Sequence, residues 1–313
     1  NSSAKQSTYL PKEDIEEYIR EGQLQKFKYS YEDDKESLEM LFADIDDPQQ
    51  TMEAIISKII DATDPDFGGG KVNTWEGFRE KVDELSQKSQ TQGRGTQRNS
   101  NEISVLSWRK FKRIVNKAIK NDDMFANRAD SSRHECRLAD AIKHISNNDV
   151  YVIDVAKLTE DKQAFVFGDA VRTIYNLKLG EYDGESGINP PSRIIVFIDE
   201  LNKYASKDTP KYSPILQEIL DVTERGRSLG VVLFGAEQFR SNIHQRVTGN
   251  CSTHAYGRTN SIETSTKDYS SLPSTYKNML TRLEQGDYLI QNPIFRSLLK
   301  IRFPKPIYKQ FKK

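Results

Sequence analysis

The stretch that decides the fold is Arg193–Glu200, which reads R-I-I-V-F-I-D-E. A run of apolar β-forming residues followed by two carboxylates predicts a buried central strand with Asp199 and Glu200 at its carboxyl edge. In open parallel sheets ligands bind at that edge. Two adjacent carboxylates repel each other there unless a cation or a proton stabilises them. A strand that ends in a solvated turn explains the same pair, so the motif alone leaves both interpretations open.

Further apolar strands alternate with helices on both sides of this stretch. Val150–Val155 (V-Y-V-I-D-V) and Gly230–Gln238 (G-V-V-L-F-G-A-E-Q) each predict a strand, and helices are expected at 163–178 and 213–225. Buried strands separated by helices indicate a parallel sheet that is covered on both faces. The predicted fold class is therefore α/β, with a doubly wound, mostly parallel sheet. Additional strands are expected at 252–259, 287–291 and 298–303, the last two forming a hairpin through Asn292 and Pro293.

The part of the chain before this α/β pattern is mostly helical. Apolar residues recur at helical spacing after Pro48, from Trp75 to Leu85, and from Ser107 to Lys120. Ser86–Glu102 is polar and cannot bury enough apolar surface to offset its ordering entropy. We predict a helical subdomain or insertion over residues 1–137, with a flexible loop at 86–102, and an α/β part over residues 138–313.

Charge and composition limit the classes of protein. The 313 residues include 46 basic and 46 acidic side chains, but residues 1–90 carry a net charge of −10 and residues 91–313 a net charge of +10. Such asymmetry is typical of a nucleic-acid face, and also of an ordinary solvated surface. Apolar runs are too short for a membrane helix, which needs roughly 20 residues. Two cysteines cannot form a disulfide framework, which favours a cytoplasmic protein.

The polar residues at the ends of the strands 193–200 and 230–238, and of the helix between them, suit phosphoryl transfer. In such a site Asp199 would hold Mg²⁺, directly or through water, and Glu200 would orient and deprotonate the attacking water. Gln238, at the tip of the next strand, would lie beside the same edge and sense the γ-phosphate or the water. Arg225 and Arg227 lie where a helix ends, and an arginine can stabilise the transferred charge from a neighbouring subunit. Favourable charges at a helix C-terminus are the simpler explanation of these arginines.

Three segments together resemble one family. They are V-F-I-D-E-L-N-K-Y at 196–204, E-R-G-R-S-L-G-V-V-L-F-G-A-E-Q at 224–238, and Y-G-R-T-N at 256–260. They are similar to the C-terminal half of HerA-type ATPases, which belong to the HerA/FtsK group of hexameric, DNA-translocating P-loop ATPases. The resemblance covers roughly residues 138–304 and implies a RecA-like core that uses ATP and Mg²⁺ as cofactors.

The resemblance also implies roles for single residues. Asp199 and Glu200 correspond to the Walker B pair, with Asp199 as the metal-binding residue, and Gln238 corresponds to the sensor. Arg227 is implied as an arginine finger, with Arg225 as the near alternative. Arg258 matches a recurrent basic position of the group and is assigned to cofactor binding.

The chain departs from the family pattern in one respect, because it contains no Walker A motif. The phosphate-binding loop needs G-x-x-x-x-G-K-[ST]. The nearest candidate, Gly68–Lys71, has Pro65 in place of the first glycine and Val72 in place of the hydroxyl residue. We therefore expect the Walker A to lie upstream of Asn1, in a longer ATPase of which this chain is the C-terminal portion.

Two functions follow from the sequence. The first is an ATP-driven DNA translocase or helicase subunit of a hexameric, HerA-like ring that handles double-stranded DNA and works with a nuclease or an antiviral effector protein. The second is a catalytically incomplete scaffold subunit that assembles an effector enzyme. For the first, the basic helix 109–120 and the loop 157–162 are candidate DNA contacts. The four histidines are scattered and lack the spacing of a zinc site.

Overall fold

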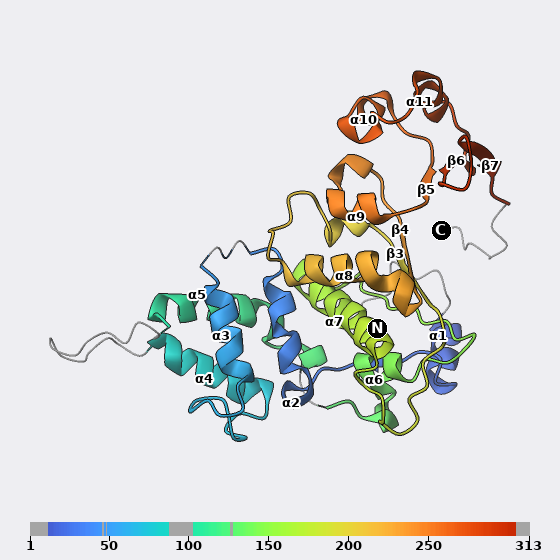
Figure 1. Ribbon diagram of the computed structural model, residues 1–313. Helices are drawn as coiled ribbons and strands as arrows, with labels where there is room; N and C mark the ends of the chain where they lie inside the picture. The colour runs from blue at the N-terminus through green and yellow to red at the C-terminus, as the bar shows by residue number, and fades with distance from the viewer. Residues whose placement is uncertain (1–11, 46, 48, 88–102, 126–127, 305–313) are drawn as a thin grey trace. The chain divides into compact units, whose positions relative to one another are not determined.

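The computed structural model describes residues 12–45, 47, 49–87, 103–125 and 128–304 (Figure 1). These residues fall into two compact units. The helical unit comprises Gln25–Val196 and Thr209–Val232, and the C-terminal unit comprises Asn1–Leu24, Phe197–Asp208 and Leu233–Lys313. The predicted boundary at residues 137/138 falls inside the helical unit. Of the predicted loop 86–102, Ser86 and Gln87 belong to a helix, and the rest lies outside the described residues.

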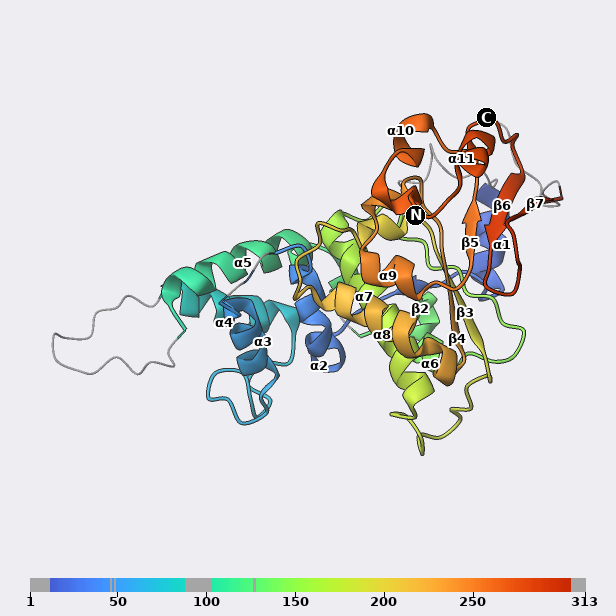
Figure 2. The same ribbon diagram turned by 45° about the horizontal axis from the view of Figure 1, so that its top comes forward.

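The helical unit is built around aromatic and aliphatic side chains. In Figures 1 and 2, α4 (Trp75–Gln87) packs along α5 (Val105–Ile119), and α7 (Glu160–Leu179) packs along α8 (Pro214–Leu229). Large aromatic side chains from several segments are fully buried and meet in edge-on and stacked pairs. The other elements of this unit are β1 (Lys26–Phe27), α2 (Tyr31–Asp34), η2 (Lys35–Phe42), α3 (Thr51–Ile60), η3 (Asp123–Phe125), η4 (Ser131–Arg133), β2 (Glu135–Cys136) and α6 (Leu138–Lys143).

Local sequence signals explain where α8 begins and ends. The Ser213 side chain accepts a hydrogen bond from the amide of Leu216, and Pro214 occupies the first turn. The helix ends at Leu229, and the capping residue Gly230 has a φ of 76°, the left-handed conformation that favours glycine. A Cβ atom at Gly230 would lie 2.2 Å from the carbonyl oxygen of Ser192, so this close approach of the two backbones requires glycine.

The motif-bearing strands lie next to each other and run in the same direction. They are β3 (Ile194–Ile198) and β4 (Val231–Gly235), which form a two-stranded sheet. The Ile194 amide donates to the Gly230 carbonyl at 3.0 Å, and the Ala236 amide donates to the Ile198 carbonyl at 2.8 Å. Because the first residues of the two strands pair with each other and so do the last, the strands are parallel, as the sequence predicts.

The predicted doubly wound sheet is wider than the sheet that forms in the described residues. The predicted strand at Val150–Val155 is wrong, because the structure has no strand there, and Val150 and Val152 are each 87% exposed. In β3, Ile195 is 58% and Phe197 76% exposed, so the sheet is not covered on both faces as predicted. β-branched residues favour a strand only where a neighbouring strand supplies hydrogen bonds and packing, and 150–155 has neither.

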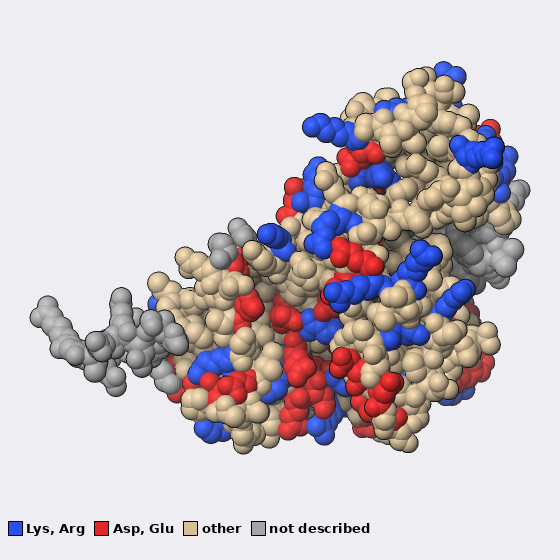
Figure 3. All heavy atoms as spheres, in the orientation of Figure 1, with Lys and Arg blue, Asp and Glu red and all other residues tan. Residues whose placement is uncertain are grey.

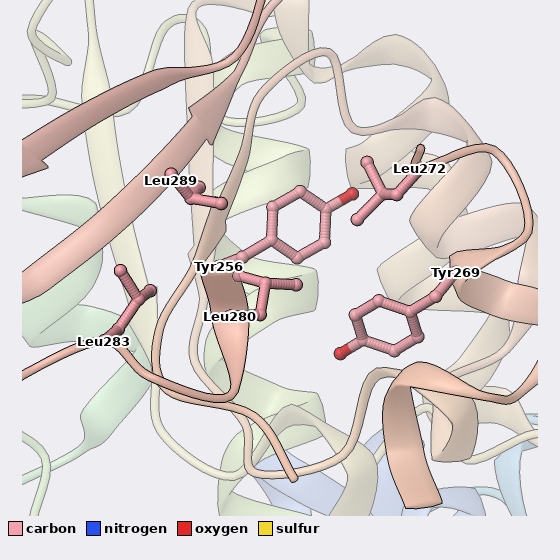
Figure 4. Close-up of a cluster of buried hydrophobic side chains, with 6 residues drawn as sticks. All are labelled: Tyr256, Tyr269, Leu272, Leu280, Leu283 and Leu289. Carbon is pink, nitrogen blue, oxygen red and sulfur yellow. The ribbon is translucent and has the colours of Figure 1, made fainter. Parts of the chain in front are cut away.

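The C-terminal unit contains an antiparallel sheet in the order β5–β6–β7. The strands are β5 (His254–Tyr256), β6 (Asp287–Gln291) and β7 (Leu299–Arg302), so the predicted hairpin is confirmed. Its core, drawn in Figure 4, joins Leu289 of β6 and Tyr256 of β5 to residues 269–283. The other elements are α1 (Lys12–Arg20), η5 (Leu201–Lys203), η6 (Arg240–Asn242), α9 (Gln245–Asn250), α10 (Ser261–Thr264), η7 (Lys267–Tyr269) and α11 (Ser274–Leu280).

Within the described ranges, the chain forms no helix with the length and apolar character needed to span a bilayer.

Candidate functional site

The two carboxylates of the motif come directly after β3. Asp199 is exposed, and one of its carboxylate oxygens, Oδ1, accepts a hydrogen bond from the Glu200 amide at 3.1 Å. The other oxygen accepts no hydrogen bond from a described residue. Glu200 precedes the short helix η5 and forms an ion pair with Lys203, one turn later. The structure thus leaves Asp199 open to a ligand and holds Glu200 against a lysine.

Glu200 has a strained backbone. Its φ and ψ are 53° and 51°, in the left-handed region, which a residue with a side chain as long as glutamate rarely adopts. Such a conformation costs on the order of 1–3 kcal/mol and persists only where the surroundings enforce it. Two backbone bonds do so here, from the Leu201 amide to the Ala236 carbonyl at 3.1 Å and from the Lys203 amide to the Glu200 carbonyl at 2.9 Å.

Gly235, the last residue of β4, lies against Leu201, the first residue of η5, and the space between them leaves no room for a side chain. A Cβ atom at Gly235 would lie 2.5 Å from a methyl carbon of Leu201, which is itself buried. The glycine therefore lets the end of β4 approach the residue that follows Glu200. This packing and the bond from Leu201 to Ala236 join the ends of the two strands.

Gln238 lies three residues beyond the end of β4. It is exposed, and its side chain makes no hydrogen bond to a described residue. Because the amide of Ala236 is bound to the carbonyl of Ile198, the backbone leading to Gln238 lies beside the backbone leading to Asp199. The structure therefore brings Asp199, Glu200 and Gln238 to one edge of the β3–β4 pair, all within the C-terminal unit.

The other predicted site residues lie elsewhere. Arg258 is exposed, two residues after β5, in the C-terminal unit. Arg225 and Arg227 are exposed in the last turns of α8, in the helical unit. The Arg225 guanidinium donates to the hydroxyl of Tyr175 at 3.4 Å, whereas Arg227 has no side-chain partner among the described residues.

Sequence reasoning missed a cluster of charged groups that begins at Glu237, the residue before Gln238. Arg240 Nη1 lies 2.8 Å from Nδ1 of His254, and the carboxylate of Glu263 accepts from both the amide and the hydroxyl of Ser241. One carboxylate oxygen of Glu237 and the Nε of Arg240 are buried without a hydrogen-bond partner in the described residues. Only the position of Glu237, next to Gln238, could have suggested this cluster from the sequence.

Burial shifts the titration of two groups in this cluster. Burial, with the nearby charge of Glu263, raises the pKa of Glu237 to about 7. Burial, with the positive charge of Arg240, lowers the pKa of His254 to about 4. His254 is therefore neutral near pH 7, and its Nδ1 accepts the hydrogen bond from Arg240. Contacts with His254 and Glu263 thus hold Arg240 and Ser241 in place, whereas the nearby Gln238 is exposed.

The edge has the donor set that Mg²⁺ uses with a nucleotide. The described residues contain no group of three or more His, Cys, Asp or Glu side chains able to enclose a metal ion. Magnesium is usually held by only one or two carboxylates together with substrate phosphates and waters. The exposed carboxylate of Asp199, with one oxygen unengaged, fits that role.

Comparison with known proteins gives likeness at the level of structure. No protein-family model and no curated sequence matches the chain. VirB4 of Thermoanaerobacter pseudethanolicus aligns over 87% of this chain and 69% of its own, with 14% identity and a TM-score of 0.52. The bacterial conjugative coupling protein TrwB aligns over 91% of this chain and 72% of its own, with 11% identity and a TM-score of 0.50.

A third structure is similar over a smaller part. The genome packaging NTPase of Sulfolobus turreted icosahedral virus 2 aligns over 54% of this chain and 72% of its own, with 15% identity and a TM-score of 0.38. At these identities the likeness concerns the fold alone, and the chain is similar in fold to VirB4 and TrwB.

Proposed function

We propose that the chain is part of an ATP-driven motor that moves double-stranded DNA. The observation that carries this proposal is the meeting of Asp199, Glu200 and Gln238 at the carboxyl ends of two parallel strands, in a fold similar to those of VirB4 and a conjugative coupling protein. Ligands of open parallel sheets bind at this edge. The HerA-type assignment and the hexameric ring rest on the sequence resemblance.

The residues of the edge have complementary roles in this proposal. Asp199 would hold the magnesium ion of a bound nucleotide with its unengaged oxygen. The ion would neutralise charge on the phosphates. Glu200 would orient the attacking water and accept its proton, and the exposed amide of Gln238 would position the same water or the γ-phosphate. The backbone hydrogen bonds on either side of Glu200 would help to orient its carboxylate, which favours catalysis by positioning.

The arginines complete the proposal through a neighbouring subunit. Arg227 is exposed near the C-terminus of α8 without a partner in the described residues, so it is available to stabilise phosphoryl-transfer charge in an adjacent copy. Arg225 is the alternative, although its guanidinium already contacts Tyr175. Arg258, which the resemblance assigns to cofactor binding, is left out of this nucleotide site because its backbone adjoins the end of α11. A nuclease or antiviral effector is proposed as the partner of the motor on the resemblance alone.

Hydrolysis by the full-length gene product tests the proposal. We expect Glu200→Gln to lower kcat for ATP by about 10²–10⁴-fold while ATP binding persists, because a positioned general base contributes that much. Glu181→Gln, an exposed change just after α7, is the control and should leave kcat unchanged. Equal hydrolysis by the wild-type protein and Glu200→Gln, with or without duplex DNA, would contradict the proposal.

A further inference from the structure

The C-terminal unit has more positive charge than its own carboxylates neutralise. Residues 254–304 contain seven lysines and arginines but four aspartates and glutamates. Glu263 is buried and bound to Ser241. Glu284 forms an ion pair with Arg302, and Asp287 with both Lys300 and Arg302. Of the four carboxylates, only that of Asp268 has no such partner within the described range.

Five cations of the same segment have no ion pair with a described residue. Figure 3 shows blue side chains with few red ones over α10, α11 and β7, the elements of this segment. Uncompensated cations on one surface create a positive potential that attracts anions. The five are Arg258, Lys267, Lys277, Arg282 and Arg296.

Three of these cations come from two backbone segments that are joined. The amide of Thr259 donates to the carbonyl of Leu280 at 3.2 Å, which places Arg258 beside the end of α11. Lys277 lies in the last turn of α11, and Arg282 lies two residues beyond its end. Arg258 and Arg282 are exposed, and Lys277 is half-buried. We call Arg258, Lys277 and Arg282 the basic edge.

The basic edge is supported from below by the core of the unit. Leu280 is completely buried, and Leu283 is nearly so, in the cluster with Tyr256 that Figure 4 shows. The backbone on both sides of the edge is therefore anchored, and the cations project from an ordered surface. An ordered surface loses less entropy when it binds than a flexible basic tail does.

Some cations in the basic segments of the helical unit are paired with carboxylates of the same unit. Lys112 of α5 pairs with Asp83 of α4, and Lys117 pairs with Asp161 at 2.6 Å. The predicted loop 157–162 extends into the first turn of α7, where Lys162 pairs with Asp122. Of the six cations at 109–120, Lys112 and Lys117 are thus neutralised within the unit, and so is Lys162 at 157–162.

We propose that the basic edge binds the phosphate backbone of double-stranded DNA. This inference rests on the proposed motor function for its choice of polyanion. Arginine guanidinium groups bind phosphate oxygens through two parallel hydrogen bonds, and lysine adds a point charge. Such contacts attract any duplex irrespective of base sequence, as a motor that travels along DNA requires.

Salt-dependent binding of a labelled random-sequence duplex, without nucleotide, tests this inference. Each phosphate contact contributes roughly −0.9 to the slope of log K against log salt concentration. We expect the triple variant Arg258→Gln/Lys277→Gln/Arg282→Gln to flatten the wild-type slope by about 2–3 and to weaken binding at least about tenfold at moderate salt. Fluorescence anisotropy of the duplex gives both quantities.

A matched triple variant on α5 is the control. Lys110→Gln/Arg113→Gln/Lys120→Gln removes the same charge from the helical unit and should keep the wild-type slope. A flat wild-type slope would overturn the inference, as would a slope lost in the α5 variant but kept in the basic-edge variant. Circular dichroism melting of each variant confirms that it is folded.

The outcome is separable from that of the hydrolysis experiment. If the basic edge binds DNA and Glu200→Gln hydrolyses ATP normally, the motor proposal fails while the binding surface stands. If hydrolysis depends on Glu200 but the basic-edge variant binds DNA like the wild type, only the binding surface is wrong. A preference for an acidic peptide over duplex DNA would also overturn the assignment.

Discussion

The amide of Ala236 donates a hydrogen bond to the carbonyl of Ile198 at 2.8 Å, and this bond joins the chain that leads to Gln238 to the chain that leads to Asp199. Residues almost forty positions apart thereby reach one edge of the sheet. The next bond, from Leu201 to Ala236 at 3.1 Å, holds Glu200 in its left-handed conformation. The backbone bonds between residues 198–201 and Ala236 therefore assemble the candidate site and also hold Glu200 in a strained conformation.

Replacing Glu200 by asparagine should stabilise the protein, because it relieves the strained backbone at this position. Asparagine tolerates the left-handed region better than glutamate, so we expect Glu200→Asn to raise the free energy of unfolding by about 1 kcal/mol. Loss of the exposed ion pair with Lys203 offsets this by at most about 0.5 kcal/mol. Glu200→Gln keeps the strain and should show no gain. Urea unfolding of both variants measures the difference, and equal stability of the two would show that the strain is not significant.

Gly230 should be far less replaceable than Gly70. Both have a φ near 75°, but a Cβ atom has no neighbour within 4 Å at Gly70 and lies 2.2 Å from the Ser192 carbonyl at Gly230. We expect Gly70→Ala to cost about 1–2 kcal/mol from the backbone conformation alone. Gly230→Ala should cost about 1–3 kcal/mol more, because the backbone at Ser192 must move. Thermal unfolding of the pair tests this, and equal melting temperatures would contradict it.

The ion pair of Arg137 with Asp34 should be important for the helical unit. Arg137 Nε lies 2.7 Å from the Asp34 carboxylate, whose side chain is 0% exposed. Burial nevertheless raises the pKa of Asp34 to about 6. We expect Arg137→Met to cost about 3 kcal/mol, because it leaves a buried carboxylate unpaired.

A second substitution checks the cause of that loss. Adding Asp34→Asn removes the unpaired charge, so the double variant should recover part of the stability that Arg137→Met loses. The loss in Arg137→Met should also be smaller below pH 6, where Asp34 is protonated. If the stability lost in Arg137→Met changed neither with Asp34→Asn nor with pH, Arg137 would act through packing instead. Denaturant unfolding of the wild type, Arg137→Met and the double variant at several pH values gives the free energies of unfolding that this comparison needs.

Glu237 and His254 should give opposite pH dependences of stability. The folded-state pKa of Glu237, about 7, lies above its ordinary value, so the folded state binds more protons and stability falls as pH rises toward 7. The folded-state pKa of His254, about 4, lies below its ordinary value, so stability rises with pH between about 4 and 6.5.

Single variants separate the two contributions. Glu237→Gln should be more stable than the wild type near pH 8, by an amount on the order of 2 kcal/mol that disappears toward pH 5. His254→Asn retains a hydrogen-bond acceptor for Arg240 and should lose less stability than the wild type below pH 6. Urea unfolding across this range checks both. A wild-type profile that neither substitution alters would contradict the assignment of these groups.

Elements with strong local signals could be predicted from the sequence. The run from Ile194 to Ile198 forms β3, and the 287–302 hairpin pairs as expected. Helix α8 begins after Ser213 as predicted but continues to Leu229, beyond the predicted end at 225. The strand at 150–155 could not be assessed in this way, because its composition favours a strand but the described residues provide no partner strand for it. Strand formation is a property of pairs of segments, and one segment cannot reveal it.

By itself, the sequence determined the candidate carboxylates, the parallel orientation of two strands and the positions of the basic residues. Only the tertiary structure decided which of these basic residues form ion pairs with carboxylates and which do not. Lys112 and Lys117 on α5 meet carboxylates from α4 and α7, whereas Arg258 and Arg282 meet none in the described part of the chain. The physical reason is that charge neutralisation depends on distances of a few ångströms between groups far apart in sequence.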